Sequence, residues 1–258
     1  MLHRGFRRAA VSVTAGTTSL GLVALLSGCG GGTPAVAATP SASPSAATPE
    51  PRAQLTRRVA AAKDKHYVIG YTLATPDQPA RSVLVTIAAD GTWRVDIQGG
   101  AMNGTANVSI AGRPEGVYQC TNTADAECVR VAAAGKPLPP ELDPQVQDVF
   151  TSWLDVLSDR QTGLAVTIVA LLPGASGTCF AVTPAVTAVA PPVDAGVLCY
   201  TDDGILTAAR LPFGTLTIAQ QPQPAPPTVV LPGPITDSAP LPMSAPPSPP
   251  SGSASPTT

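Results

Sequence analysis

Apolar and polar residues alternate along two long stretches of the chain, residues 67–132 and 164–219. Because the side chains of a β-strand point to opposite faces in turn, a period of two predicts strands. The first stretch divides into six predicted strands. Connections as short as the Asp90-Gly91 turn indicate an antiparallel meander. Four of these strands carry the following apolar faces: Tyr67, Ile69, Tyr71 and Leu73; Val83, Val85 and Ile87; Trp93, Val95 and Ile97; Ala106, Val108 and Ile110.

The second stretch predicts five further strands, which brings the total to about eleven. Leu164–Leu172 is a nearly continuous apolar run, as expected for a central strand. The segments 196–200 and 205–210 predict a hairpin with Asp202-Asp203-Gly204 as its turn. Residues 178–182 and 215–219 complete the set.

Two helices interrupt this pattern. Residues 54–64 predict a short helix with Arg57, Arg58 and Lys63 exposed. A stronger helix is predicted after Asp143, which fits an N-cap, and Pro144, whose missing N–H costs nothing at the first helical position. Its apolar stripe recurs at helical spacing: Val146, Val149, Phe150, Trp153, Leu154 and Leu157. The predicted fold class is therefore α+β, a large antiparallel sheet with one or two helices on its concave face.

The start of the chain has the order of a bacterial lipoprotein signal. Basic residues come first, then an apolar run that ends in Leu26-Ser27-Gly28-Cys29. A basic region, an apolar region and a small-residue cleavage site are typical of a signal peptide. The cysteine after the small pair predicts that residues 1–28 are removed and that Cys29 is diacylated. The alternatives are an ordinary secretory signal with a chance cysteine and an uncleaved anchor.

Composition divides the rest of the chain. Residues 29–51 predict a disordered Ser/Thr/Pro tether, residues 52–220 a folded domain, and residues 221–258 a disordered Pro-rich tail. The three arginines before residue 9 would leave with the signal peptide, so the 15 basic residues fall to 12 against 17 acidic ones. A nucleic-acid binder would show a basic patch, and none is visible. The predicted location is the extracytoplasmic face of the membrane, held there by the acyl chains.

Four cysteines remain in the predicted domain: Cys120, Cys128, Cys179 and Cys199. An even number fits disulfides in an oxidising compartment, and three pairings can be drawn. The pairs Cys120–Cys128 and Cys179–Cys199 are favoured because each closes a short loop within a β-rich stretch. Zinc sites favour closely spaced Cys and His ligands, and His66 is the one histidine of the predicted mature chain. No metal site and no cofactor is therefore predicted.

No catalytic constellation stands out. Ser176 lies in Gly174-Ala175-Ser176-Gly177, which lacks the spacing of a nucleophile elbow. His66 reads as a surface residue. Asp202 and Asp203 resemble a carboxylate pair, but their place before Gly204 favours turn chemistry. The sequence predicts a protein that is not an enzyme.

The many small side chains of the strands leave two interpretations open for the space under the stronger helix. It is either a filled core or an apolar cavity that takes lipid tails. For the cavity, we expect Phe150 and Trp153 to line the space or its mouth, because they are large residues in a domain of small ones, together with Leu157 of the same stripe.

A resemblance to a known family rests on the order of elements, the cleavage box and three short sequence segments. The segments are Tyr67–Leu73, Gly116–Cys120 and Gly177–Phe180. Over about residues 52–220 the chain resembles actinobacterial cell-envelope lipoproteins of the LolA/LppX type. This resemblance implies a half-barrel, a curved sheet around helices, that carries lipids or lipoglycans between the membrane and the outer envelope. The long tail and the extra cysteine pairs depart from that pattern.

Two functional hypotheses follow. The leading one is a membrane-anchored, non-enzymatic lipoprotein that binds or carries the acyl chains of an envelope lipid or glycolipid. The alternative is an interaction module with a solid core, which binds a protein partner or the cell wall through its tails or a sheet edge.

Overall fold

The computed structural model describes residues 50–76, 78–185 and 191–244. The predicted signal peptide, Cys29 and nearly all of the tether lie outside these residues. Two α-helices are present in the described part of the chain, α1 (Pro51–Lys63) and α2 (Ser152–Ser158), with three 3₁₀ helices, η1 (Met102–Gly104), η2 (Pro140–Leu142) and η3 (Val146–Phe150). The strands are β1 (Tyr67–Ala74), β2 (Arg81–Ile87), β3 (Trp93–Ala101), β4 (Ala106–Arg113), β5 (Gly116–Thr121), β6 (Cys128–Ala132), β7 (Leu164–Val169), β8 (Thr178–Pro184), β9 (Gly196–Tyr200), β10 (Leu206–Leu211) and β11 (Gly214–Ile218).

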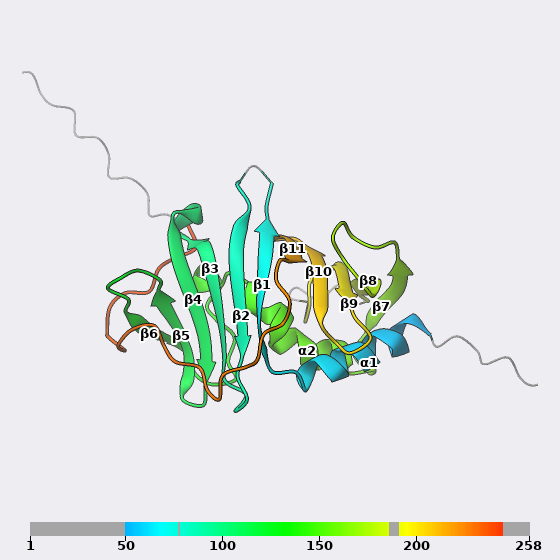
Figure 1. The fold of residues 1–258 in the computed structure, drawn as a ribbon, viewed down its shortest axis with the longest axis horizontal. Coiled ribbons are helices and arrows are strands. Elements are labelled where there is room, and N and C mark those ends of the chain that lie inside the picture. The colour runs from blue at the N-terminus through cyan, green and yellow to red at the C-terminus, as the bar shows by residue number, and fades with distance from the viewer. Residues whose placement is uncertain (1–49, 77, 186–190, 245–258) are drawn as a thin grey trace, which may run out of the picture. The chain divides into compact units, whose positions relative to one another are not determined.

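All eleven strands join one antiparallel sheet (Figure 1), in the order β6-β5-β4-β3-β2-β1-β11-β10-β9-β8-β7. Each half is a meander of sequential hairpins. The halves meet where β1 pairs with β11, for example at Tyr71 opposite Ile218. The sheet does not close on itself, since β6 and β7 are its two edges. The α+β half-barrel predicted from the sequence is therefore confirmed.

The predicted apolar faces of β1 to β4 become one buried inner face. Pairing aligns Ile69 with Val85, Val85 with Val95, and Val95 with Ile110, so one apolar row crosses four strands. All four residues belong to a single core cluster that also contains residues of α1, η3 and α2. Burial of this continuous face is the main stabilising contribution to the fold.

The stronger predicted helix is broken in two. Gln145 has a left-handed φ of 62°, so no helix begins at Pro144. Asp143 instead accepts a hydrogen bond from the Gln145 N–H at 2.8 Å. The hydroxyl of Thr151 donates to the Gln147 carbonyl at 2.8 Å, and the Thr151 N–H donates to the Asp148 backbone carbonyl at 3.1 Å. Because Thr151 satisfies the Gln147 carbonyl with its side chain, the regular helical ladder stops between η3 and α2.

The prediction of a central strand at Leu164–Leu172 is wrong. Its ordered part, β7, is an edge strand with β8 as its partner. Part of the apolar run is exposed, at Ile168 and Leu171, and the rest is divided between the two faces of the sheet. Leu172 packs on the outer face with Cys179 and Cys199, whereas Leu164 and Val166 pack on the inner core.

The prediction of a disordered tail from residue 221 is also wrong as far as residue 244. This segment runs from β1, where Gln223 pairs with Val68, across the outer face to the β6 edge (Figure 1). Val229 is buried there against Ala88 and Ala111. At the β6 edge, the Cys128 N–H donates to the Pro234 carbonyl and the Thr236 N–H donates to the Cys128 carbonyl, both at 2.8 Å. We call residues 221–244 the strap.

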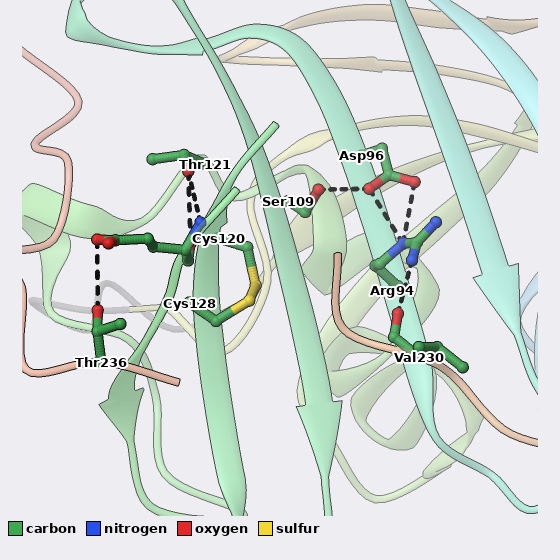
Figure 2. The surroundings of a disulfide bond; sticks show 9 residues. Arg94, Asp96, Ser109, Cys120, Thr121, Cys128, Val230 and Thr236 are labelled. Atoms are coloured by element: carbon green, nitrogen blue, oxygen red, sulfur yellow. Dashed lines mark hydrogen bonds and ion pairs between the residues drawn. A yellow bond between two sulfur atoms is a disulfide. The ribbon is translucent and has the colours of Figure 1, made fainter. Parts of the chain in front are cut away.

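Two disulfides join directly opposed residues of neighbouring strands. Cys120 pairs with Cys128 between β5 and β6, and Cys179 pairs with Cys199 between β8 and β9. This is the pairing favoured from the sequence. Figure 2 shows the first of them, with the strap on either side: Thr236 near the disulfide, and Val230, whose carbonyl accepts a hydrogen bond from Arg94 at 2.7 Å. Both bonds fit an extracytoplasmic protein.

Candidate functional site

The residues expected to line a lipid cavity occupy different environments. Phe150 is 5% exposed and Leu157 is 0% exposed, and both lie in the main core cluster. The Phe150 ring contacts the Tyr71 ring from β1, with centroids 5.1 Å apart. Trp153 is also mostly buried but reaches an open groove, which neither Phe150 nor Leu157 borders. The structure therefore places Phe150 and Leu157 in the core and Trp153 at a groove.

This first groove, the sheet-end groove, has a volume of about 780 Å³. It lies between the β2–β3 and β4–β5 turns, the loop after β6, and the segment η3–α2. Both tryptophans of the chain, Trp93 and Trp153, border it. Its carboxylates and bases are Asp90, Asp143, Asp148, Asp155, Arg113 and Lys136. The groove is thus mixed in polarity, since aromatic and charged side chains both line it.

Two side chains of η3 carry the unusual electrostatics of the sheet-end groove. Gln147 is 2% exposed, and its Nε2 donates to Asp143 Oδ1 at 2.7 Å, while its Oε1 has no hydrogen-bond partner. Burial raises the pKa of Asp148 to about 6, and nearby Asp143 adds to the rise, although the Ser152 hydroxyl donates to Asp148 at 2.7 Å and opposes it. The groove therefore offers an unused acceptor and a carboxylate that is costly to ionise.

The raised pKa of Asp148 predicts that Asp148→Asn stabilises the protein at neutral pH. An unfolded aspartate has a pKa of about 3.9, so between about pH 4 and pH 6 the native state binds more protons and stability falls as pH rises. Above pH 6 the full penalty of about 2–3 kcal/mol is present. We expect Asp148→Asn to raise the free energy of unfolding by about 2 kcal/mol at pH 7.5 and to change it little at pH 4. Urea denaturation at both pH values measures this difference.

The matched control is Asp237→Asn, which removes an exposed carboxylate of the strap. Its effect should be small and equal at the two pH values. An Asp148→Asn effect of the same size at pH 4 and pH 7.5 would contradict the assignment.

A second groove, the edge groove, has a volume of about 540 Å³ and follows β7. It is bordered by residues 164–167 of β7, by Arg160 and Thr162 before the strand, and by Glu50, Arg52 and Ala53 at the start of α1. Arg52 is 9% exposed, and its Nη2 donates to the Asp159 carbonyl. Its Nε and Nη1 have no hydrogen-bond partner.

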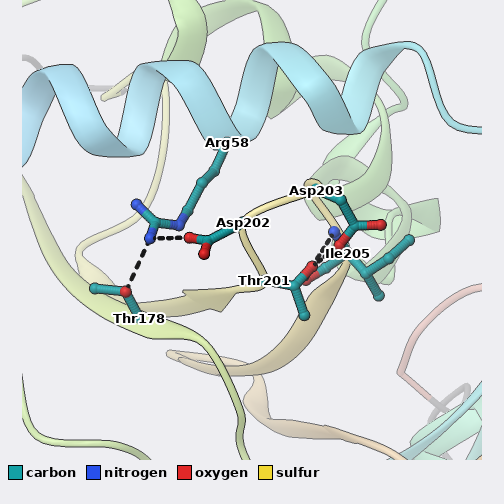
Figure 3. A network of polar contacts seen from close by, with 6 residues as sticks. All are labelled: Arg58, Thr178, Thr201, Asp202, Asp203 and Ile205. Carbon is teal, nitrogen blue, oxygen red and sulfur yellow. Dashed lines mark hydrogen bonds and ion pairs between the residues drawn. The ribbon is translucent and has the colours of Figure 1, made fainter.

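The candidates for catalysis serve structural roles. Asp202 accepts a hydrogen bond from Arg58 of α1, which also donates to Thr178 Oγ1 at 3.1 Å (Figure 3). Asp203 accepts from Thr201 Oγ1 at 2.6 Å and from Lys65 Nζ at 3.0 Å. The predicted turn is thus confirmed. Asp202 also attaches α1 to the β9–β10 hairpin, and Asp203 attaches Lys65, which follows α1, to the same hairpin.

The prediction that Arg58 is exposed is wrong, because its side chain is buried in the structure. Its guanidinium lies 5.4 Å from the centre of the Phe180 ring. The close approach of α1 to this hairpin also depends on Gly204, which has a φ of 93°. A Cβ there would lie 2.4 Å from the Ala62 nitrogen.

Ser176 and His66 are not brought together. The exposed His66 Nδ1 donates to the Ala88 carbonyl at 2.7 Å. Ser176 is held through its backbone, since its carbonyl accepts from Thr207 Oγ1 at 2.8 Å. In the described part of the chain, no three His, Cys, Asp or Glu residues group to hold a metal ion. No helix among the described residues is long and apolar enough to span a membrane.

The residues that sequence reasoning missed are Arg52, Gln147 and Asp148. Each is a polar residue beside an apolar stripe, which usually means exposure, and only the burial of α1 and η3 makes them distinctive. The signal available in the sequence was limited to the position of Asp148 between Val146, Val149 and Phe150.

Comparison with known proteins gives little beyond this geometry. No protein-family model matches the sequence, and no curated protein matches it. Among solved structures, a chain of the Pseudomonas aeruginosa MucA/MucB complex is similar, with a TM-score of 0.37 and 14% identity. The match covers 68% of this chain and 58% of that chain, less than two thirds of its length. A likeness of this size carries no argument about function.

Proposed function

We propose that this protein is a non-enzymatic, extracytoplasmic interaction module that binds a protein partner along the β7 edge of its sheet. The observation that carries the proposal is the difference between the two edges. The strap covers β6 through its hydrogen bonds to Cys128. At the other edge, no described strand pairs with the outer side of β7.

An uncovered edge strand is a template for pairing with another chain, and proteins usually blunt it with charges, proline or a bulge. The β7 sequence Leu-Ala-Val-Thr-Ile-Val has no charge and no proline, and its register with β8 is regular throughout. Ile168, at the open edge, is 47% exposed. An uncharged, apolar and regular edge of this kind is suited to binding an extended segment. Acylation of Cys29 would hold the module at the membrane.

Site-specific photo-cross-linking of the full chain in cells tests this function. A photoreactive residue at Thr167, exposed on β7, should cross-link to one defined protein, with the reciprocal site in an extended segment of that protein. The same residue placed at Asp237, on the strap beside the covered edge, is the matched control. The proposal fails if Thr167 yields no protein adduct, or if both positions yield the same adducts.

A second candidate function, binding of an envelope lipid or glycolipid, is favoured by the sheet-end groove. Its volume of about 780 Å³ falls within the range of about 300–1,000 Å³ typical of ligand sites. Its two tryptophans and the free Gln147 acceptor suit an amphipathic molecule with a donor group in its head. Native mass spectrometry of the purified full chain should show bound lipid. Protein without lipid, whose tryptophan fluorescence does not respond to glycolipid micelles, would exclude this candidate.

A further inference from the structure

The edge groove joins two features that are unusual on their own. One is the open backbone of β7, and the other is the buried guanidinium of Arg52. They come from distant parts of the sequence and meet because α1 lies beside β7 (Figure 1). Any molecule that fills the edge groove would contact both.

Arg52 is held in place but not satisfied. Its Nη2 is bound to a backbone carbonyl, so the side chain is oriented, whereas Nε and Nη1 have no acceptor. Burial lowers the pKa of Arg52, although Asp159 and Glu50 oppose this effect. An unsatisfied buried donor on a cation is costly, and the cost is recovered when an anionic acceptor reaches it. Exposed Arg160 borders the same groove and adds a second positive charge. The negative charges near Arg52 are those of Glu50 and Asp159, and neither carboxylate is hydrogen-bonded to Nε or Nη1.

The backbone of β7 supplies the second half of the site. In an antiparallel pair, every second residue of an edge strand directs its N–H and C=O away from its partner. An extended peptide that pairs with these groups would run antiparallel, as all strands of this sheet do. Its C-terminal end would then lie beside Leu164, at the end of β7 where Arg52 and Arg160 border the groove.

Neither of two long segments outside the described residues, 30–49 and 245–258, is a suitable occupant. Residues 30–49 contain four prolines and no acidic residue, and residues 245–258 contain five prolines and no acidic residue. Proline cannot donate to a strand ladder. The β7 strand of a second copy would bring no carboxylate to Arg52. Charge complementarity therefore favours a different protein.

We propose that the edge groove binds an extended, acidic segment of a partner protein, which adds to β7 as an antiparallel strand and places a carboxylate near its C-terminal end against Arg52 and Arg160. This inference rests on the proposed function and specifies the partner's chemistry. The β7 backbone supplies binding along the strand, and the arginines select the anionic segment and fix its register.

Peptide binding to the full chain, measured by fluorescence anisotropy, tests the inference. The probe is a fluorescein-labelled eight-residue peptide of alternating valine and threonine with glutamate at position seven. It should bind at least tenfold more tightly than the matched peptides with glutamine or lysine at that position. Arg52→Gln should abolish this preference. Arg57→Gln, which removes an exposed arginine of the same helix, should preserve it.

Two further peptides test strand addition itself. Each is N-methylated on alternate residues, one on the odd positions and one on the even positions. Because only alternate N–H groups face β7 in a strand pair, one peptide should lose binding and the other should keep it. Equal effects of the two would overturn strand addition. This comparison uses the unaltered protein, so it does not depend on the folding of a variant.

The remaining outcomes separate the other occupants. Equal binding of the glutamate and glutamine peptides overturns the acidic segment. Binding that is seen only after residues 30–49 or 245–258 are deleted identifies a segment of this chain as the occupant and overturns the inference. A concentration-dependent dimer that the peptide dissociates indicates a second copy and also overturns it. If the peptide fails while Thr167 still cross-links to a partner in cells, the acidic strand is wrong and the proposed function stands.

Discussion

Ending the chain at Gln220 is expected to unfold the domain, or to lower its free energy of unfolding by at least about 5 kcal/mol, a large part of typical domain stability. The truncation removes the strap, which composition alone would treat as dispensable. It exposes the outer surface that Val229 covers and the β6 edge. It also removes both partners of the Gln119 amide on the inner face. That amide accepts from the Leu241 N–H at 2.6 Å and donates to the Leu241 carbonyl at 2.9 Å.

Gln119 provides the sharpest test of how the strap stabilises the domain. It is buried in the full chain, and the truncation removes the protein groups that bond its donor and acceptor. Where the amide then stays out of reach of water, this loss costs about 1–3 kcal/mol. Replacing it with leucine in the truncated chain should therefore restore part of the lost stability. The same Gln119→Leu change in the full chain should be destabilising, since it leaves the Leu241 backbone groups unsatisfied. Urea denaturation followed by circular dichroism measures all four proteins.

The control is a chain that ends after Ser244, where the described strap ends. It should be as stable as the full chain. Equal stability of the chains that end at residues 220 and 244 would show that the strap is not part of the folded unit.

The strap also shows why composition misled the prediction of the domain boundary. Proline lacks an N–H but keeps its carbonyl, so a Pro-rich segment is a poor strand yet a competent row of acceptors. The carbonyls of Pro226, Pro227, Pro234 and Pro242 accept hydrogen bonds from N–H groups of Ala89, Asp90, Cys128 and Met102. These donors lie far away in sequence, at turns and edges of the sheet. A disordered tail and a bound strap therefore have the same local composition.

Period-two patterning succeeded because it reports a local property, the face on which a side chain lies. The faces predicted for β1, such as Ile69 and Tyr71, are buried as expected. The place of a strand in the sheet is not local. β7 becomes an edge because β1 pairs with β11 and the second meander then grows outward from that pair. Nothing in residues 164–172 encodes that pairing, so the apolar run by itself predicts a central strand.

The candidate site residues also divide into those that local sequence predicts and those that only tertiary structure reveals. Trp153 could be singled out by size and periodicity, and it does border the sheet-end groove. Arg52 could not, because an arginine at the start of a short helix is usually exposed. Its burial follows from the packing of α1 beside α2 and β7, which depends on contacts such as Arg58 with Asp202. The groove that carries our further inference is thus a product of tertiary structure.

Phe150→Ala is expected to lower the free energy of unfolding by about 4 kcal/mol. In the structure Phe150 is a core residue, and its ring contacts Tyr71 across the interface between η3 and the sheet. Removing the ring loses this contact and leaves a cavity that the surrounding β-strands cannot fill. If Phe150 instead lined a lipid cavity, the substitution would mainly change lipid occupancy and would cost little stability in lipid-free protein.

A leucine pair calibrates this prediction. Leu157 is 0% exposed in α2, and Leu171 is 56% exposed after β7, so the same chemical change samples the core and the surface. Leu157→Ala should cost about 2–5 kcal/mol, whereas Leu171→Ala should stay within about 0.5 kcal/mol of the parent. All three variants are compared by urea denaturation after lipid extraction. Large losses for Phe150→Ala and Leu157→Ala, with none for Leu171→Ala, would establish a solid core beneath α2. Small losses for both core variants would instead favour an open, lipid-accessible space there, because side chains that border such a space give up fewer packing contacts when they are truncated.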